Sequence, residues 1–187
     1  MPVSTDPMVP GREDLPWPDE PATNGAPTPV TTFPTVAASP GLPIGRLRRA
    51  DPVELWRADE FATWLGSNLD EVGDLMGIRL TAAAAGAASP GTVVATDPDG
   101  AQVRVVVELG PSSDETFGLV MRQMVASGAK VAVWVCGKAQ GEHLTSVAWL
   151  NREITGQLHV IGVEAVRIDD SIPAPIFRLA TPTVSAG

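Results

Sequence analysis

The sequence predicts an α/β fold in which helices flank a mixed β-sheet. Residues 92–96 and 103–109 are rich in β-branched side chains and are joined by an Asp-Pro-Asp-Gly turn, which is typical of a β-hairpin. Apolar runs at residues 130–136 and 157–168 predict further strands, and apolar residues recur at helical spacing before and between these strands. The predicted order is helix, three strands, helix, strand, helix and strand.

Proline divides the chain into two parts. Eleven of the 18 prolines lie in residues 1–43, where they remove backbone donors and disfavour helix. We therefore predict that residues 1–45 form a proline-rich arm, disordered in isolation, and that residues 46–187 form one folded domain. Trp17 and Phe33 are the large apolar side chains that stand out in the arm. Either they anchor it on a partner or on its own domain, or the arm is an unattached linker.

The charge of the chain disfavours nucleic acid as a general partner. The net charge is −9, and residues 51–187 alone hold 9 Lys and Arg against 17 Asp and Glu. Proteins that bind duplexes neutralise several phosphates with basic residues, and the absence of Tyr leaves few rings for stacking on single strands. The only basic cluster is Arg46, Arg48 and Arg49. It is either a solvated approach to the first helix or a contact for nucleic acid or an acidic partner.

The first helix begins at Asp51, because a capping Asp, a Pro at the first position and a Glu at the third follow one another. Gly77 is a suitable end. We therefore predict one helix over residues 52–76 with a single apolar face, followed by a short strand at residues 78–83. The apolar face consists of Phe61, Trp64, Leu65, Leu69, Val72, Leu75 and Met76.

The run at residues 103–109 shows little alternation, which predicts a strand inside the sheet with both faces covered. Ser113, with two acidic residues after it, begins the second helix. A third helix is predicted over residues 142–153, and the chain closes with an extended Ser-Ile-Pro-Ala-Pro-Ile-Phe segment. The predicted inner face of the second helix consists of Phe117, Val120, Met121, Met124 and Val125.

Cysteine and histidine give little sign of chemistry. Cys136 is the single cysteine, so no disulfide forms within the chain, and we interpret it as a small buried hydrophobe in a reducing compartment. His143 and His159 lie in different elements without a third zinc ligand, and His143 is predicted in a surface or capping role at a helix start. With no run of 18 apolar residues and no signal peptide, we expect a cytoplasmic protein without a membrane segment.

The element order is similar to that of the PD-(D/E)XK nuclease superfamily. In detail the chain resembles one bacterial branch of it, proteins of restriction-endonuclease-like fold. The matching stretches keep their order from about residue 45 to the end of the chain, and they are ADPVELW with FATWLGSNLDEVGDLMG, then DPDG, EHLTSVAWLN and GVEAVRIDDSIPAPIF. The resemblance implies a restriction-endonuclease-like mixed sheet flanked by helices, with the proline-rich arm before it.

Typical members of that branch carry an Asp before the turn and Glu-Asn-Gln after it. The two acidic side chains would hold a divalent metal that activates water. In this chain Thr92 stands at the Asp position, Val106 at the Glu and Glu108 at the Gln. A valine cannot coordinate a cation. The resemblance therefore implies a nuclease fold without nuclease chemistry or a cofactor, which acts by binding a protein partner or by self-assembly.

In this hypothesis the arm makes the partner contact through Trp17, Phe33 and the arginine cluster. Two alternatives stay open. One is a residual nuclease that uses Mg²⁺ or Mn²⁺ at a migrated site, with Glu108 as one ligand and Asp114 or Glu115 as the second. Against it, a one-residue slip turns every side chain of a strand to the other face, and the start of a helix accounts for both acidic residues. The other alternative is nucleic-acid binding without cleavage.

Overall fold

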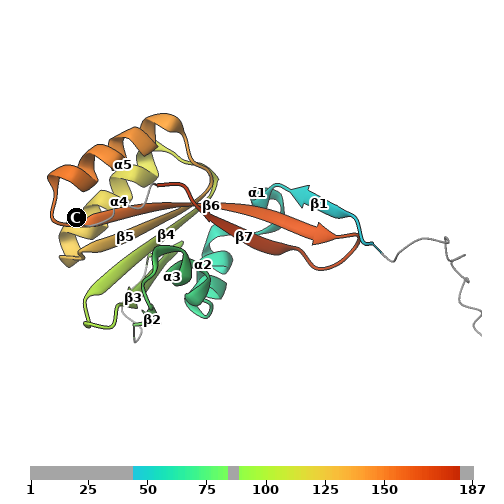
Figure 1. The fold of residues 1–187 in the computed structure, drawn as a ribbon, viewed down its shortest axis with the longest axis horizontal. Helices are drawn as coiled ribbons and strands as arrows, with labels where there is room; N and C mark the ends of the chain where they lie inside the picture. The colour runs from blue at the N-terminus through green and yellow to red at the C-terminus, as the bar shows by residue number, and fades with distance from the viewer. Residues whose placement is uncertain (1–43, 84–88, 182–187) are drawn as a thin grey trace, which may run out of the picture. The chain divides into compact units, whose positions relative to one another are not determined.

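The computed structural model describes residues 44–83 and 89–181. They form an α/β structure with a mixed, strongly curled sheet of seven strands in the order β1-β6-β5-β4-β3-β2, with β7 also paired to β6 (Figure 1). The strands are β1 (Leu47–Ala50), β2 (Thr81–Ala82), β3 (Thr92–Thr96), β4 (Gln102–Pro111), β5 (Val131–Lys138), β6 (Gln157–Ile168) and β7 (Ala174–Leu179). The helices are α1 (Pro52–Leu55), α2 (Ala58–Gly66), α3 (Asp70–Met76), α4 (Asp114–Ser127) and α5 (Gly141–Glu153).

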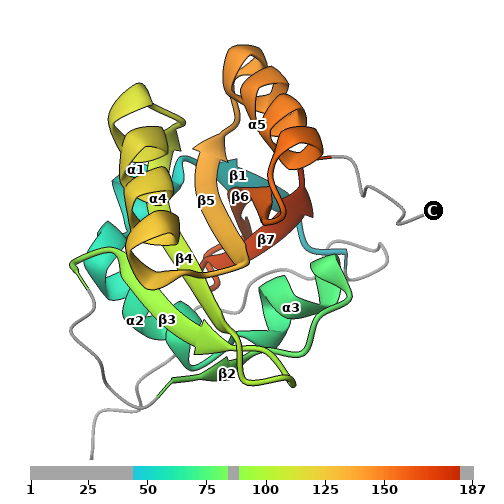
Figure 2. The ribbon, with the colours of Figure 1, turned by 90° about the vertical axis from the view of Figure 1, so that its left-hand side faces the viewer.

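The sheet separates two hydrophobic cores. Helices α4 and α5 cover one face, and α2 and α3 lie on the other (Figure 2). Because successive strand residues point to opposite faces, Val105 belongs to the core under α2 and its neighbour Val106 to the core under α4 and α5. Strand β4 lies between β3 and β5 and is buried on both faces, as predicted.

Local sequence signals account for the hairpin and for the start of α4. The side chain of Asp97 accepts hydrogen bonds from the N–H groups of Asp99 (3.0 Å) and Ala101 (2.8 Å), and Gly100 has a φ of +79°. These contacts close the predicted turn between β3 and β4. The hydroxyl of Ser113 accepts a hydrogen bond from the N–H of Thr116 at 3.2 Å, which confirms the predicted cap.

The prediction of one helix over residues 52–76 is wrong, although both of its ends are confirmed. Asp51 caps α1 and Gly77 ends α3 in the left-handed conformation. The chain leaves the helix at Trp56, which is extended and packs its ring against Phe61 at a centroid distance of 5.2 Å. It leaves again after α2, where the side chain of Asn68 donates to the carbonyl of Trp64 at 2.8 Å. Three helices therefore replace one.

The structure corrects or refines three other predictions. The basic cluster is exposed and leads into α1, as one of its two interpretations expects, and its backbone over Leu47–Ala50 also forms β1 against β6. The closing segment is more than extended, because Ala174–Leu179 forms β7 on β6. The strand predicted at residues 78–83 is reduced to the two residues of β2. Val125, predicted on the inner face of α4, has 79% of its surface exposed.

Strand β6 has two successive neighbours on one edge. Ile161 and Gly162 pair with both β5 and β7, whereas Ala165 and Val166 pair with both β1 and β7. Strands β5 and β1 therefore lie on the same edge of β6, one after the other, opposite β7. Between them, residues 163–164 have no strand partner on that edge. We call this interruption the sheet gap.

Candidate functional site

The hairpin brings Thr92 and Val106, which stand at the expected acidic positions, directly opposite each other. Thr92 is buried, and its hydroxyl accepts a hydrogen bond from Nε2 of Gln123 on α4 at 3.1 Å. Val106 is 2% exposed and belongs to the core under α4 and α5. The pair therefore presents a hydroxyl held by an amide, and a hydrocarbon, where the resemblance expects two carboxylates.

Glu108 is held by three donors. Its Oε1 accepts a hydrogen bond from the hydroxyl of Ser113 at 2.6 Å, and its Oε2 accepts from the N–H of Ser113 and from the indole N–H of Trp134, each at 3.2 Å. Trp134 lies on β5, two residues before the strand partner of Glu108. Hydrogen bonds to a charged group are stronger than those between neutral groups. Both carboxylate oxygens are therefore used in joining β4, β5 and the start of α4.

A second network contains a serine, a histidine and an aspartate. The hydroxyl oxygen of Ser112 lies 2.8 Å from Nδ1 of His143, and Nε2 of His143 lies 3.0 Å from Oδ1 of Asp114. The backbone N–H of Gln140 also donates to the Ser112 hydroxyl oxygen at 2.9 Å. Both ring nitrogens of His143 are therefore within hydrogen-bond distance of a partner, and the tautomer of the ring decides which of them donates.

This network has the composition of a hydrolytic triad but not its exposure. In such enzymes the aspartate is buried and the serine faces the substrate. Here Ser112 is 1% exposed, whereas the side chain of Asp114 is 99% exposed. A serine enclosed in this way does not reach a substrate. We interpret the network as a structural connection between the start of α4 and the start of α5.

His143 is buried, which corrects the predicted surface or capping role. It is 4% exposed, and its ring lies 5.9 Å from that of Phe117 and 5.2 Å from that of Trp134. The two networks therefore meet at Trp134, which donates to Glu108 and packs on His143. Sequence reasoning missed this cluster, because Ser112 and His143 are 31 residues apart and carry no local signal of contact.

Cys136 is buried next to this cluster, which confirms its interpretation as a core residue. Burial, and secondarily the charge of Glu108, raise the pKa of the Cys136 thiol to about 12. The thiol is therefore protonated at neutral pH. A reactive cysteine needs the opposite, a lowered pKa.

The residues of the alternative metal site lie near one another in sequence but serve different contacts. Glu108 faces Ser113 and Trp134, whereas Asp114 faces His143. Glu115 is exposed on the first turn of α4. Over residues 44–83 and 89–181, no group of three or more His, Cys, Asp or Glu side chains is close enough to hold a metal ion.

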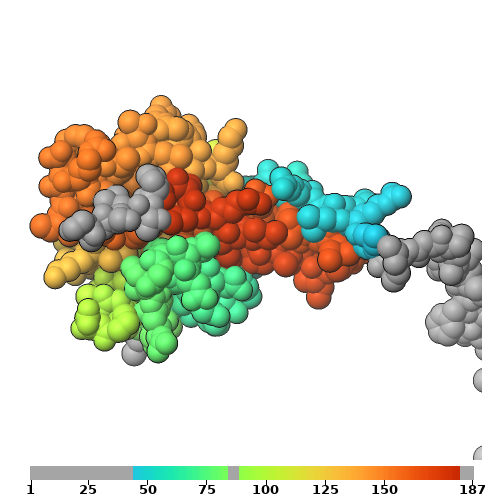
Figure 3. All heavy atoms as spheres, in the orientation of Figure 1, coloured from blue at the N-terminus to red at the C-terminus, as the bar shows by residue number. Residues whose placement is uncertain are grey.

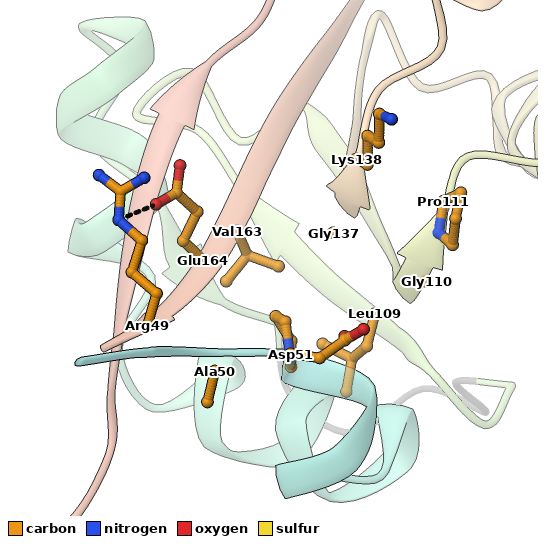
Figure 4. Close-up of a pocket in the computed structure, with 11 residues that line it drawn as sticks. Arg49, Ala50, Asp51, Leu109, Gly110, Pro111, Gly137, Lys138, Val163 and Glu164 are labelled. Atoms are coloured by element: carbon orange, nitrogen blue, oxygen red, sulfur yellow. Dashed lines mark ion pairs between the residues drawn. The ribbon is translucent and has the colours of Figure 1, made fainter. Parts of the chain in front are cut away.

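The sheet gap opens into a pocket of about 330 Å³ at the carboxyl ends of β4 and β5 (Figure 4). Arg49 on β1 extends toward Glu164 on β6, with Nε 3.5 Å from Oε2, and Arg178 lies 3.6 Å from the other oxygen. The Glu164 carboxylate therefore lies between two arginines of its own chain. The pocket is lined by Arg49, Ala50, Asp51, Pro52, Leu109, Gly110, Pro111, Gly137, Lys138, Val163 and Glu164.

The structure describes only some of the predicted partner-binding residues. Arg49 lines the pocket at the sheet gap, while Arg46 and Arg48 are exposed and do not line it. The backbone N–H of Arg46 donates to a side-chain oxygen of Asp169 at 3.2 Å, which joins the start of β1 to the end of β6. Trp17 and Phe33 lie outside the described residues.

His159, a half-buried residue of β6, provides a test that is independent of either network. Burial lowers the pKa of His159 below its ordinary value of 6.5, and its Nε2 has no hydrogen-bond partner within the described residues. The unfolded chain therefore takes up this proton at a higher pH than the folded chain. The neutral His159 contributes fully to the free energy of unfolding above about pH 6.5. As the pH falls below that value, the free energy of unfolding decreases by at most about 1.4 kcal/mol per pH unit.

We expect His159→Gln to reduce this acid sensitivity. Urea unfolding of both proteins between about pH 7.5 and about pH 5.5, roughly one unit on either side of the ordinary pKa, gives the two slopes. His143 is present in both proteins and serves as the internal control. Equal slopes for the two proteins would contradict the assignment to His159.

No helix in the described ranges is long and apolar enough to cross a membrane. Comparison with protein-family models, with curated proteins and with solved structures gives no match for this chain.

Proposed function

We propose that this chain is a catalytically silent protein of restriction-endonuclease-like fold that acts by binding a protein partner. The observation that carries the proposal is the state of Glu108. It is the one acidic residue at the expected motif, and both of its oxygens accept hydrogen bonds from Ser113 and Trp134. A carboxylate used in this way stabilises the junction of β4, β5 and α4.

The chemistry of phosphodiester cleavage supports the same conclusion. Nucleases of this kind rely on a divalent metal that activates water and stabilises charge on the phosphate. Magnesium prefers oxygen ligands, above all carboxylates. At the two expected acidic positions the chain offers the buried methyl groups of Val106 and the hydroxyl of Thr92, which already accepts from Gln123. Neither supplies a carboxylate to a metal.

The exposed apolar surface supports a binding role. Large exposed apolar side chains that gather on a surface mark interaction sites. In our proposal the proline-rich arm adds a contact through Trp17 and Phe33, together with Arg46, Arg48 and Arg49 at its junction with the domain. Two exposed apolar side chains of the described part, Ile172 (91%) and Trp64 (38%), line one groove together.

The proposal is tested by titrating the full chain with Mg²⁺ and Mn²⁺ and by incubating it with single- and double-stranded DNA. We expect no metal-dependent rise in melting temperature and no cleavage. Glu142→Ala, on the exposed first turn of α5, is the matched control for Glu108→Ala. Cleavage that needs Mn²⁺ or Mg²⁺, is lost in Glu108→Ala and is kept in the control would establish the residual nuclease instead.

The same samples test nucleic-acid binding without cleavage. Binding that weakens steeply with salt, and is lost when Arg46, Arg48 and Arg49 are replaced together by alanine, would support that alternative. We expect no such binding. Residues 51–187 carry 17 acidic against 9 basic side chains, and Arg49 is already paired with Glu164.

A further inference from the structure

An apolar groove lies between α2 and the segment that leads into β7. Its volume is about 490 Å³. One side is formed by Trp56, Phe61 and Trp64, and the other by residues 172–175, with Glu60 as the only charged residue of the lining. We call it the aromatic groove. It is separate from the sheet gap and from the Glu108 and His143 networks, with which it shares no residue.

The rings of the groove support one another. Phe61 is 4% exposed, and its ring lies 5.2 Å from Trp56, 5.5 Å from Trp64 and 6.1 Å from Phe177. The rings of Trp64 and Phe177 are nearly parallel, with an interplanar angle of 9° and a centroid distance of 6.4 Å. Each ring is therefore held by at least one other, which fixes the aromatic surface before any ligand arrives.

The break between α1 and α2 builds this surface. Trp56 is extended, with φ −133° and ψ 152°, and its N–H donates to the carbonyl of Pro52 at 3.0 Å. This conformation places the Trp56 ring beside Phe61, five residues later. In a continuous helix, two residues five positions apart are more than one turn apart along the axis, and their side chains point in different directions around it. Trp56, where the predicted helix is interrupted, therefore forms part of one wall of the groove.

The rim of the groove leaves apolar groups in water. Trp64 is 38% exposed and Ile172, on the opposite side, is 91% exposed. Pro173 and Pro175 add two rings without backbone donors beside it. Grooves lined by aromatic rings bind proline-rich segments, whose polyproline II conformation is already formed and loses little entropy on binding.

Charge specifies the occupant further. Glu60 lies in the groove, and the exposed Asp169 and Asp170 precede Ile172 on the turn between β6 and β7. Arg57, next to the groove, is paired with Asp59 at 3.2 Å and lies 3.8 Å from Glu60. Arg57 balances only one of the two carboxylates of Asp59 and Glu60, so this side of the groove keeps a net negative charge. A ligand that carries Lys or Arg beside its prolines complements this charge.

We propose that the aromatic groove binds a proline-containing segment of a protein partner, in polyproline II conformation and flanked by a basic residue. This inference rests on the proposed binding function and names the chemistry of the partner. Its test uses neither metal nor DNA. Absence of peptide binding would refute only this inference, whereas metal-dependent DNA cleavage would refute the proposed function.

The experiment is a titration of the ¹⁵N-labelled full chain, followed through the five tryptophan indole N–H signals. The probe is the capped peptide Arg-Pro-Leu-Pro-Pro-Leu-Pro-Arg, and its control has every proline replaced by serine. Single Trp→Phe variants assign the signals. We expect the signals of Trp56 and Trp64 to shift with the probe and not with the control peptide. The signals of Trp134 and Trp149, which lie outside the groove, stay in place.

Variants separate the contributions of the groove. Trp64→Ala is expected to weaken binding at least about tenfold, because aromatic anchors dominate such interfaces, while the matched Trp149→Ala leaves it unchanged. Glu60→Gln is expected to weaken the Arg-flanked probe about two- to fivefold and not a Gln-flanked version of it. Ile172→Ser, at a site 91% exposed, repeats the test where Trp64→Ala fails to fold.

Three results would overturn the proposal. The first is no shift of Trp56 and Trp64 up to about 1 mM probe, the upper end of weak specific affinity. The second is a shift centred on Trp149. The third is a self-association of the chain that Ile172→Ser abolishes, which would assign the groove to a second copy.

Discussion

Trp134→Ala is expected to destabilise the domain by about 3–5 kcal/mol, the range for a large aromatic side chain removed from a core. Trp134 is fully buried, stacks on Phe117 at 5.8 Å and packs on His143 at 5.2 Å. Its loss also removes the indole donor from Glu108. A typical domain is stable by about 5–15 kcal/mol, so this change removes much of the total. Urea unfolding followed by circular dichroism gives the value.

The hydrogen bond of Trp134 is separated from its packing by a double-mutant cycle. Trp134→Phe removes the indole N–H and keeps a ring, and Glu108→Gln removes the charge and keeps the shape. We expect a coupling of about 1.5–3 kcal/mol, since the bond involves a charged group. Trp149→Ala, at a side chain 54% exposed, is expected to stay within about 0.5 kcal/mol of the parent protein. Additive effects of the first two variants would contradict the structural role given to Glu108.

Gly137→Ala is expected to cost about 2–3 kcal/mol through overpacking. A Cβ at Gly137 would collide with the backbone oxygen of Leu109 and lie 3.3 Å from that of Gly110. Both atoms belong to the end of β4, where the register with β5 shifts between Glu108 and Pro111. A backbone oxygen cannot move aside as a side chain does. The two strands must therefore separate at the edge of the sheet gap.

The matched control for this substitution is Gly141→Ala. A Cβ at Gly141, on the first turn of α5, has no atom within 4 Å. Alanine in a helix is more favourable than glycine, so this variant is expected to be neutral or slightly more stable. Thermal unfolding of the two variants is the measurement. Equal melting temperatures would show that β4 and β5 adapt to the added methyl group.

The sequence was informative where contacts are local. The Asp97 side chain bonds to residues two and four positions later, so the turn of the hairpin is encoded within a few residues. The caps at Asp51 and Ser113 are equally short in range. By contrast, β1 is four residues long and mostly exposed, and it pairs with β6, which lies more than 100 residues later in the chain. Nothing within residues 47–50 indicates that pairing.

The breaks in the predicted helix and the contacts of the Glu108 and His143 networks could not be predicted from the spacing of apolar residues. Apolar residues keep helical spacing across residues 52–76, but Trp56 and Asn68 find contacts that interrupt the helix. The pairing of positions 92 and 106 follows from the hairpin. The partners of Glu108 and Ser112 include Trp134 and His143, on separate elements. Only the packing of β4, β5, α4 and α5 brings them together.

Strand β6 pairs first with β5 and then with β1, and we expect its resistance to local opening to differ along its length. Its first half pairs with β5, and burial extends from Leu158 as far as Val166, whereas Ile168 at its end is exposed. Its second half extends with β1 and β7 beyond α4 and α5 (Figures 1 and 3). Regions with few buried contacts open at a small fraction of the global free energy. We therefore expect the mostly exposed β1 to detach from the end of β6, where Ile168 is 56% exposed, while amide protons in the first half of β6 stay protected from exchange.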